Sequence, residues 1–422
     1  MTIISRLKKC LYFVVAGYFR FFADFSFKKW KPRVMAITGS AGKTTMLGLV
    51  EVELGVKAHY SHNANSVYGI AFDILGLRGI TGSKWRWLYL FFAAPLRAIN
   101  YQRREKYYVV EIDGERPHET EYIAKWLKPE VTLWVSLGRS HAVFFEGAVA
   151  SGEFEDVDEA ITHEFAMLPR YTKKLVLIDD DNWRMREATK DIGAKVVGLS
   201  KSKVTGYEVY PNRAVFEIGK KEFSFKHPMP RDISMQLVML VELMRYLELP
   251  VNYDLADFVM PPGRSNYLEG KRGVKMIDSS YNAHIISMTT VLDMVKSLRA
   301  PHKWLVVGDI IDQGKLEKDE HEKLAELILE AKPEKVVMVG RRTAEYTLPL
   351  IKGEIDVVSF RKPQQALKYL EKNLTGKETV IFKGSQYLEW IVEKLLADPA
   401  DVSLLPRQDI AHKKRRASWG LE

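Results

Sequence analysis

Short apolar runs alternate with longer segments of helical spacing along most of the chain. In the first half these runs cover residues 34–37, 107–112, 131–136 and 174–178, and in the second half 274–277, 304–307, 335–339, 356–359 and 379–382. Such runs between helical patterns are typical of parallel strands whose two faces are covered by helices. The pattern therefore predicts the α/β fold class, with right-handed crossovers and mostly parallel sheets.

One region departs from this alternation. Residues 204–225 alternate between apolar and polar positions, with turns at 211–212 and 219–220, which predicts a β-hairpin region before a helix from about 231 to 247. A plausible linker follows at 250–262. We expect a basic aromatic helical segment at 1–32, a central domain at 33–250, a C-terminal Rossmann-like domain at 251–400 and an irregular basic tail at 401–422.

The first apolar run leads directly into a glycine turn and a helical pattern. The turn reads Thr38-Gly39-Ser40-Ala41-Gly42-Lys43-Thr44-Thr45, and we assign all eight residues to the binding of a nucleotide. Such a turn directs backbone N–H groups into one concavity at a helix N-terminus, where Lys43 would reach the terminal phosphates and Thr44 would ligate Mg2+. The common P-loop has a glycine where Ile37 stands. The alternative is a plain strand-to-helix turn.

Two further candidates follow strands of the predicted central sheet. Glu111 lies near the end of the run at 107–112, and His141 comes soon after the run at 131–136. Because the carboxyl ends of parallel strands face the ligand in an α/β nucleotide fold, Glu111 stands where a magnesium ligand is needed. The alternatives are a solvated acid and a structural or surface histidine. The acidic cluster at 179–182 is better explained as a helix cap.

Composition and charge narrow the class of protein. The chain has 422 residues, of which 46% are hydrophobic and 28% charged, and one cysteine, which excludes a disulfide framework and suits a reducing compartment. The net charge of +9 lies largely at the ends, since residues 1–33 hold eight Lys or Arg against Asp24 alone. The body between is near neutral, so a nucleic-acid-binding face is not indicated.

Two aromatic segments require an explanation. Residues 10–19 are apolar on every side, so a helix there must either pack against the protein's own body or lie on a membrane surface; both explanations remain open. The basic N-terminus favours an anionic surface. For residues 85–95 a core helix that ends near Pro95 is favoured over a membrane contact.

Several motifs, taken in their order, resemble those of the Mur ligases, and the closest likeness is to the MurF type. They are Ile37-Thr-Gly-Ser-Ala-Gly-Lys-Thr-Thr45, Asn63-Ala-Asn65 with Gly69, Glu111, His141, Pro262-Gly-Arg264, Ile277-Asp-Ser-Ser-Tyr-Asn-Ala283, Val307-Gly-Asp309, His321 and Lys383-Gly-Ser385. The family consists of ATP-dependent enzymes that form amide bonds in peptidoglycan assembly. The resemblance implies a central P-loop-type α/β ATPase domain and a C-terminal Rossmann-like domain.

The resemblance also implies roles for individual residues. Lys43 would bind the β- and γ-phosphates, Thr44 and Glu111 would hold Mg2+, and His141 would serve a second metal. From the C-terminal domain it implies that Arg264 and Asp278 reach the site, that Tyr281 and Asn282 lie near the nucleotide, and that Gly308, Asp309 and Lys383-Gly384-Ser385 line the cleft for the amine. The implied chemistry is attack of a carboxylate on the γ-phosphate, followed by displacement of phosphate from the acyl phosphate by an amine.

Three departures from the family pattern affect these expectations. No lysine lies between Lys128 and Lys173, where the family usually has a carbamylated lysine, and we hypothesise that Glu164 supplies that carboxylate. The alternative is a surface glutamate beside one weakened metal site. Ser279 replaces the second acid of the family's Asp-Asp-Ser-Tyr-Asn, and Asp312-Gln-Gly314 replaces Glu-Leu-Gly, so substrate selectivity is expected to differ.

The third departure lies before the nucleotide loop. Only about 33 residues precede it, whereas MurE- and MurF-type enzymes carry a separate domain that grips the UDP-sugar. We therefore expect this grip to be missing or replaced, which would suit a lipid-linked or membrane-proximal acceptor.

These observations lead to two hypotheses about function. The first is an ATP- and Mg2+-dependent ligase of the Mur type that joins a carboxylate-bearing cell-wall precursor to an amino acid or dipeptide. The second is a nucleotide-binding scaffold of the same fold without ligase activity. For either we expect a cytoplasmic protein, with its N-terminus at the inner face of the membrane and no nucleic-acid partner.

Overall fold

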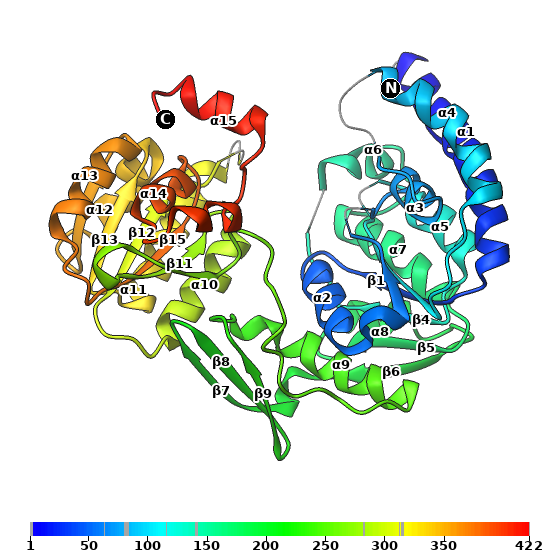
Figure 1. Ribbon diagram of the computed structural model, residues 1–422, viewed down its shortest axis with the longest axis horizontal. Coiled ribbons are helices and arrows are strands. Elements are labelled where there is room, and N and C mark those ends of the chain that lie inside the picture. Colours follow the sequence, from blue (N-terminus) through cyan, green and yellow to red (C-terminus); the bar gives the residue numbers. More distant parts are fainter. Residues whose placement is uncertain are drawn as a thin grey trace. The chain divides into compact units, whose positions relative to one another are not determined.

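The computed structural model describes residues 3–62, 64–79, 84–114, 116–139, 142–281, 283–311, 313 and 316–421. The chain divides into two compact units. The first holds the residues up to Lys203 together with Met235–Val251, and the second holds Val204–Ser234 and the residues from Asn252 onward. The predicted α/β fold class is confirmed, because each unit is built on a six-stranded sheet with helices (Figure 1).

The sheet of the first unit is entirely parallel, in the order β2-β3-β1-β4-β5-β6. Its strands are β1 (Arg33–Thr38), β2 (Ala58–Tyr60), β3 (Tyr107–Ile112), β4 (Val131–Trp134), β5 (Leu175–Asp179) and β6 (Lys195–Leu199). β1 lies between β3 and β4, in a register that pairs Ile37 with Glu111 and Thr38 with Trp134. This order brings the loop after β1 next to the ends of both neighbouring strands.

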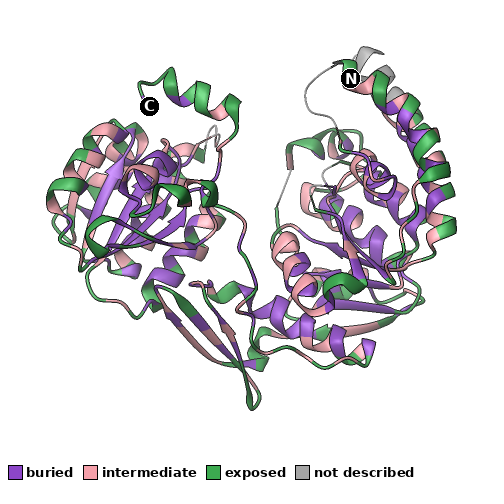
Figure 2. Ribbon diagram, in the orientation of Figure 1, coloured by how far each residue is buried: buried purple, intermediate pink, exposed green. Residues whose placement is uncertain are grey.

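Nine helices of the described residues belong wholly or mainly to the first unit. They are α1 (Ile3–Trp30), α2 (Lys43–Leu54), α3 (Val67–Ile74), α4 (Lys84–Asn100), α5 (Glu119–Leu127), α6 (Glu146–Ala150), α7 (Val157–Arg170), α8 (Trp183–Ala188) and α9 (Ser234–Leu247). The strands of the sheet are mostly buried, whereas many of the helices carry exposed residues along one side (Figure 2).

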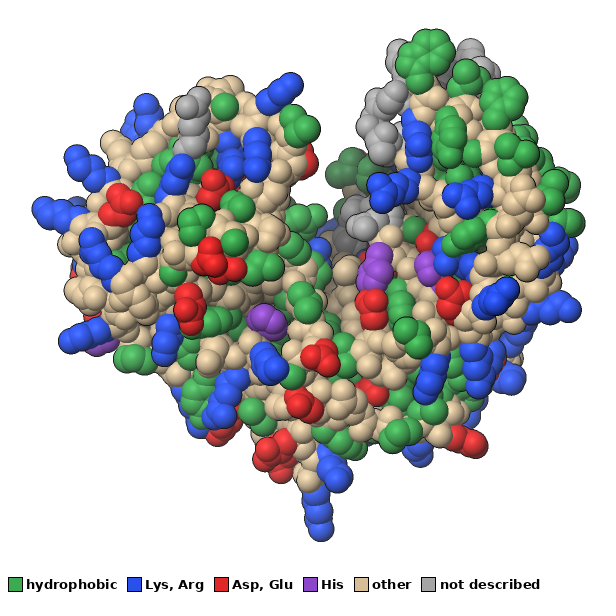
Figure 3. Space-filling view, viewed as in Figure 1, with side chains coloured by type: hydrophobic (Ala, Val, Ile, Leu, Met, Phe, Trp, Pro, Cys, Tyr) green, Lys and Arg blue, Asp and Glu red, His purple; other side chains and the backbone are tan. Residues whose placement is uncertain are grey.

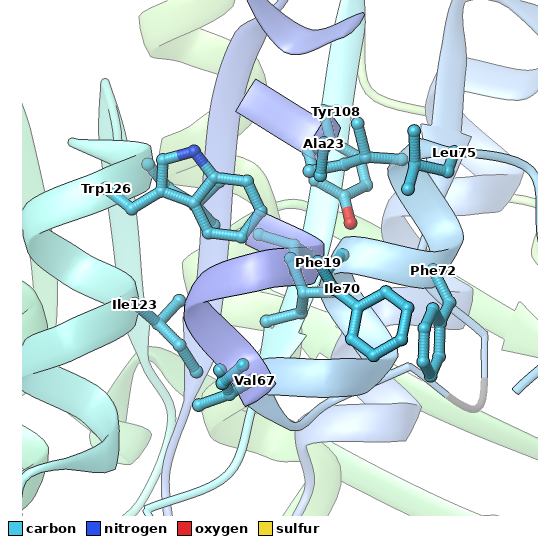
Figure 4. Packing of buried hydrophobic residues seen from close by; sticks show 14 of the residues in the cluster. Phe19, Ala23, Val67, Ile70, Phe72, Leu75, Tyr108, Ile123 and Trp126 are labelled. Atoms are coloured by element: carbon cyan, nitrogen blue, oxygen red, sulfur yellow. The ribbon is translucent and has the colours of Figure 1, made fainter. Parts of the chain in front are cut away.

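The N-terminal helix α1 packs against the body of the first unit through one of its faces. Phe19 is fully buried, with its ring centroid 4.8 Å from that of Phe72 on α3 (Figure 4). Ala16 and Ala23, one turn away on either side, are buried in the same cluster. Residues 10–19 were expected either to pack on the protein's own body or to lie on a membrane surface. The face of α1 that contains Phe19 packs on the body.

The helix formed by the second aromatic segment, α4, does not end near Pro95 as expected. The helix continues through Pro95 to Asn100. A proline inside a helix leaves the carbonyl four residues earlier without its N–H partner, and that carbonyl belongs to Phe91. The hydroxyl of Tyr18 on α1 donates to this oxygen at 2.7 Å, which satisfies the group that Pro95 leaves unbonded.

The second unit contains a mixed sheet in the order β10-β11-β15-β12-β13-β14, in which only β10 is antiparallel to its neighbour. Its strands are β10 (Asn266–Glu269), β11 (Lys275–Ser279), β12 (Lys303–Gly308), β13 (Lys335–Val339), β14 (Asp356–Phe360) and β15 (Thr379–Lys383). The helices are α10 (Ile285–Ser297), α11 (Glu317–Ala331), α12 (Leu348–Ile351), α13 (Pro363–Asn373), α14 (Leu388–Leu395) and α15 (Ile410–Ala417).

The predicted β-hairpin region forms a separate antiparallel sheet of β7 (Val204–Tyr210), β8 (Arg213–Ile218) and β9 (Lys221–Phe225). It makes its contacts within the second unit, where the N–H of Arg299 donates to the carbonyl of Val209 at 2.8 Å. The linker pattern predicted a single division near residue 250. The two compact units instead exchange chain segments, because residues 204–234 belong to the second unit and residues 235–251 to the first. The functional roles of the parts remain predictions.

The C-terminal tail is more regular than its composition predicts. A 3-10 helix at Pro399–Leu404 and helix α15 occupy the segment that we expected to be irregular. Arg416 of α15 is buried and pairs with Glu393 at 2.8 Å. Long-range partners of this kind, which composition does not reveal, hold the tail in place.

Candidate functional site

The turn between β1 and α2 depends on glycine at two positions. Gly39 and Gly42 have φ angles of 138° and 79°, and a Cβ atom at Gly39 would lie 2.7 Å from the carbonyl oxygen of Ser136. The loop is bonded to the segment after β4: Ser136 Oγ accepts from the N–H of Ala41 at 2.8 Å, and Ser40 Oγ donates to the carbonyl of Gly138 at 2.7 Å. The loop is thus fixed at the carboxyl edge of the sheet, at the N-terminus of α2.

The side-chain ammonium of Lys43, the first residue of α2, contacts two oxygen atoms. Its Nζ donates to the carbonyl of Gly39 at 2.6 Å and pairs with Oδ1 of Asp113 at 2.7 Å. The other oxygen of Asp113 accepts from the side-chain amide of Asn65. No motif in the sequence marks Asp113, although its position two residues after Glu111 is a signal.

Thr44 and Glu111 are brought together as predicted for a pair of Mg2+ ligands. The Thr44 hydroxyl lies 3.0 and 3.2 Å from the two carboxylate oxygens of Glu111. The N–H of Glu111 donates to Ser61 Oγ at 2.9 Å, which fixes the end of β3. A hydroxyl and a carboxylate beside a phosphate-binding turn are the hard oxygen ligands that Mg2+ takes together with phosphates, so these residues fit that ion.

Two other residues of the turn have different surroundings. Thr38 is fully buried and its hydroxyl donates to the carbonyl of Ile112 at 3.0 Å, so this side chain joins β1 to β3. Thr45 is half-buried in the first turn of α2. Their predicted contacts with a nucleotide stay predictions.

Glu164 has a structural role that the sequence analysis did not anticipate. It is only 3% exposed, and its two oxygens accept from the N–H groups of Thr120 at 2.6 Å and of His118 at 2.8 Å, at the N-terminus of α5. Burial raises the pKa of Glu164, and these backbone bonds oppose the shift. Glu164 is therefore a buried helix cap and not a surface residue, and this arrangement does not support its predicted role as a metal ligand.

The second predicted metal position cannot be built from the residues described. His141 lies outside the described residues. Among the residues that the structure does describe, no three His, Cys, Asp or Glu side chains converge as they would around a metal ion.

A pocket of about 320 Å³ adjoins Lys43 within the first unit. Asp113 contributes to both, and the pocket is also lined by Tyr12, Asn65, Ser66, Tyr68, Arg116 and Glu119. The Tyr12 hydroxyl donates to Glu119 at 2.7 Å, and the Arg116 guanidinium lies 5.2 Å from the centre of the Tyr12 ring. Helix α1 thus supplies a wall of this pocket, and most of these residues escaped the sequence analysis because they are distant from each other in the chain.

The second unit has a buried pair of ionisable groups at the ends of adjacent strands. Asp278 on β11 is fully buried, and Lys383 ends β15, in register with Ser279. Burial raises the pKa of Asp278 to about 6 and lowers that of Lys383 to about 7. Oδ1 of Asp278 accepts from the N–H of Ser280 at 3.0 Å, whereas the buried Oδ2 has no hydrogen-bond partner among the residues that the structure describes. Such an orphaned carboxylate oxygen points to a functional rather than a structural group.

Arg264 and Tyr281, two other residues predicted on the second unit, lie near Asp278. Tyr281 follows Asp278 by three residues, and Arg264 precedes Asn266, which pairs with Asp278 in the sheet. The Arg264 guanidinium stands 5.1 Å from the ring centre of Tyr281. The N–H and hydroxyl of Ser265 each lie 2.9 Å from the hydroxyl of Ser279, which explains how the chain uses a serine in place of the second acid. Asn282 lies outside the described residues.

Asp309 binds parts of the second unit to each other. Its carboxylate accepts from the N–H of Thr343 at 2.9 Å and from the side-chain amide of Gln386 at 3.1 Å, and it is fully buried. A Cβ at Gly308 would meet the carbonyl oxygen of Ser385 at 2.0 Å, so only glycine fits there. These contacts give Gly308, Asp309 and Ser385 structural roles, and their predicted contact with an amine stays a prediction.

Comparisons with known proteins agree with this architecture. Residues 263–386 match the family model described as Mur ligase, glutamate ligase domain. The chain is 22% identical over 391 residues to UDP-N-acetylmuramoyl-tripeptide--D-alanyl-D-alanine ligase of Buchnera aphidicola (subsp. Baizongia pistaciae), an alignment that covers 86% of this chain and 75% of the relative. The same enzyme of Rickettsia prowazekii is 20% identical over 369 residues, covering 84% and 76%.

Solved structures show the same fold. MurF ligase from Thermotoga maritima, in complex with ADP, matches with a TM-score of 0.68 and 20% identity over 95% of this chain and 84% of that chain. MurF from Acinetobacter baumannii matches with a TM-score of 0.66 and 20% identity over 90% and 80%.

Proposed function

Because the chain belongs to the Mur ligase family and its relatives are of the MurF type, we propose that it is an ATP-dependent carbon–nitrogen ligase. It activates the carboxylate of a cell-wall or related envelope precursor as an acyl phosphate and joins it to an amino acid or a dipeptide. The observation that carries this proposal is the grouping of Lys43, Thr44 and Glu111 around the glycine turn at the carboxyl edge of the first sheet.

ATP binds with its phosphates in this turn. The backbone N–H groups at the start of α2 and the Lys43 ammonium face the developing negative charge, and the pairing of Lys43 with Asp113 keeps the ammonium directed at the turn. The Thr44 hydroxyl and the Glu111 carboxylate would hold Mg2+, which would neutralise charge on the phosphates. The MurF structure from Thermotoga maritima was determined with ADP, which supports this class of ligand.

The acid substrate binds in the pocket beside Asp113. Arg116 is a cationic side chain of this pocket, and its guanidinium can bind the carboxylate of an acidic precursor. The pocket also contains two carboxylates, of which Asp113 is paired with Lys43 and Glu119 accepts from the Tyr12 hydroxyl. The pocket shares Asp113 with Lys43, so an acid held there lies next to the phosphate-binding turn. Attack by a carboxylate oxygen on the γ-phosphate then releases ADP and leaves an acyl phosphate.

We assign the binding and deprotonation of the amine to the second unit. Burial raises the pKa of Asp278 to about 6, and its buried Oδ2 meets no hydrogen-bond partner in the described part of the chain. We therefore assign Asp278 to orient an ammonium group and accept its proton. We assign Arg264 to the phosphate that leaves when the amine displaces it.

The proposal is tested by measuring phosphate release with ATP and Mg2+ against a panel of acidic precursors and amines. We expect release only when both an acid and an amine are present, and a new amide in the products by mass spectrometry. Lys43→Ala should abolish release while the fold is retained, because it removes a phosphate-facing charge. A protein that binds ATP but releases no phosphate with any acid and amine would support the scaffold hypothesis instead.

A further inference from the structure

Helices α1 and α4 each present a line of exposed apolar side chains. On α4 they are Trp85, Leu88, Tyr89, Phe92, Leu96 and Ile99, and on α1 they are Val14, Tyr18, Phe21 and Phe25. Spacings of three and four residues place each set on one side of its helix. Trp85 is 80% exposed, Phe21 71% and Phe92 69%, so these are large side chains in contact with solvent.

These exposed lines are not the surfaces that attach the helices to the protein. The core of the first unit already buries Phe19 and Ala23 of α1 and Leu90 and Ala94 of α4. Each helix is therefore apolar on two sides, one packed and one open. A helix that is apolar on a second side needs a second apolar environment.

The two lines belong to one surface, which we call the α1–α4 face. The helices run side by side (Figure 1), and Tyr18 joins them, since its hydroxyl donates to the carbonyl of Phe91 and its ring centroid lies 5.0 Å from that of Phe91. Hydrophobic side chains gather over these helices, with Lys and Arg among them (Figure 3). Contiguous exposed apolar surface of this kind marks an interaction site.

The charge of the two helices has one sign. Their sequences contain nine Lys or Arg and a single acid, Asp24, which is paired with Lys28 at 2.7 Å. Lys28 and Lys29 are exposed and continue the line of α1 beyond Phe25. Most of the chain's net charge of +9 can therefore be attributed to these two helices.

We propose that the α1–α4 face binds the surface of an anionic lipid bilayer. Aromatic and aliphatic side chains of both helices enter the interface, and the basic side chains contact the headgroups. The two helices would lie along the surface, since their exposed lines run the length of each. Among the described residues, no helix combines the length and the hydropathy that a membrane-spanning segment requires.

Charge argues against a second copy of this chain as the occupant. In a two-fold symmetric dimer the same patch faces itself, so the basic residues of two copies would be brought together. Like charges opposed across an interface are unfavourable, whereas an anionic lipid surface is complementary. This proposal is independent of the ATP chemistry, since its residues do not include Lys43, Thr44 or Glu111.

The test is flotation of the full chain with vesicles of phosphatidylcholine alone or mixed in equal parts with phosphatidylglycerol. We expect binding at least tenfold tighter to the anionic vesicles, and weaker at high salt. The double variant Phe21→Ser/Phe92→Ser should weaken binding by at least tenfold, because two large apolar side chains are lost. The matched control is Trp183→Ser, an exposed tryptophan of α8 away from this face, which should bind like the unsubstituted chain.

A second readout uses Trp85, whose fluorescence should shift to shorter wavelength when the indole enters the interface. Unchanged far-UV circular dichroism and thermal unfolding of the variants show that the fold is kept. Failure of the unsubstituted chain to float, or equal binding by the double variant and the Trp183→Ser control, overturns the proposal. Light scattering that shows a dimer abolished by the double variant also overturns it, in favour of a second copy.

Discussion

The substitution Glu164→Gln separates a helix cap from a metal ligand. Both oxygens of Glu164 accept N–H groups at the start of α5, and the side chain is nearly fully buried. Glutamine keeps one acceptor and turns an NH2 group toward the other N–H. One charge-assisted hydrogen bond is then lost and a buried donor is left unpaired.

The magnitude follows from three contributions. Loss of a hydrogen bond to a charged group destabilises by about 1.5–3 kcal/mol. Loss of negative charge at a helix N-terminus adds about 0.3–1 kcal/mol. Because burial raises the pKa of Glu164, the ionised side chain is partly disfavoured in the fold, and the neutral amide recovers some of that free energy. The net expectation is a loss of about 1–3 kcal/mol, or on the order of 5 °C in Tm for a unit of this size.

The assay is thermal unfolding by circular dichroism, combined with amide hydrogen exchange at Thr120. The Thr120 amide should exchange faster in the variant, while the dependence of turnover on Mg2+ stays unchanged. Glu159→Gln is the matched control, since Glu159 lies on the same helix and is exposed. Its Oε2 accepts from the N–H of Glu155 at 2.7 Å, a bond that the glutamine carbonyl can keep, so the effect should be under about 0.5 kcal/mol. Unchanged stability together with a weakened dependence on divalent metal would refute the cap and support the metal ligand that the sequence suggested.

Three further predictions concern the turn and the buried acid of the second unit. Gly39→Ala should lower ATP affinity by at least about tenfold by titration calorimetry and destabilise by about 1–3 kcal/mol, because its Cβ meets Ser136 and its φ is positive; retained affinity would contradict the assigned loop geometry. Asp113→Ala should weaken ATP binding several-fold with the fold intact, since Lys43 loses its partner; unchanged binding would show that this pairing does not position the ammonium. Burial raises the pKa of Asp278 to about 6, so its contribution to stability is present below about pH 4 and is lost as pH rises through 6. In urea unfolding, the free energy of unfolding of Asp278→Asn should therefore rise by roughly 3 kcal/mol relative to that of the unsubstituted chain between pH 4 and 7. Equal pH slopes of the two proteins would refute the shift.

The fold was largely predictable from the sequence because buried parallel strands read as short apolar runs. Every strand of the first sheet except β2 and β6, and every strand of the second except β10, corresponds to a predicted run. The missed strands are short or carry exposed positions, as in β6, so their patterns are weak. Helix α4 was predicted to end near Pro95, because the hydrogen bond from Tyr18 that satisfies the freed carbonyl comes from a distant segment.

The candidate site was likewise predictable only in part from the sequence. Lys43, Thr44 and Glu111 could be found because local motifs place them at strand and helix ends, and the structure brings them together. Asp113 has its function-related partner, Lys43, 70 residues earlier, so no local spacing reveals the pair.

Long-range contacts also explain the surroundings of Glu164, which its local sequence did not reveal. Glu164 has the residue type and helix position of a ligand, but what it binds is the N-terminus of α5 some 44 residues earlier in the chain. The sequence contains the helix and its charge, and the tertiary fold determines which backbone amides that charge meets.

The central claim is that a carboxylate is activated by phosphorylation before it meets the amine. It is tested most directly by labelling the carboxylate of the acid substrate with oxygen-18, supplying ATP, Mg2+ and the amine, and measuring the label in the products by mass spectrometry. An acyl phosphate transfers one labelled oxygen to the inorganic phosphate, and this is the result we predict. Label in AMP, or unlabelled phosphate released while amide forms, would contradict the account.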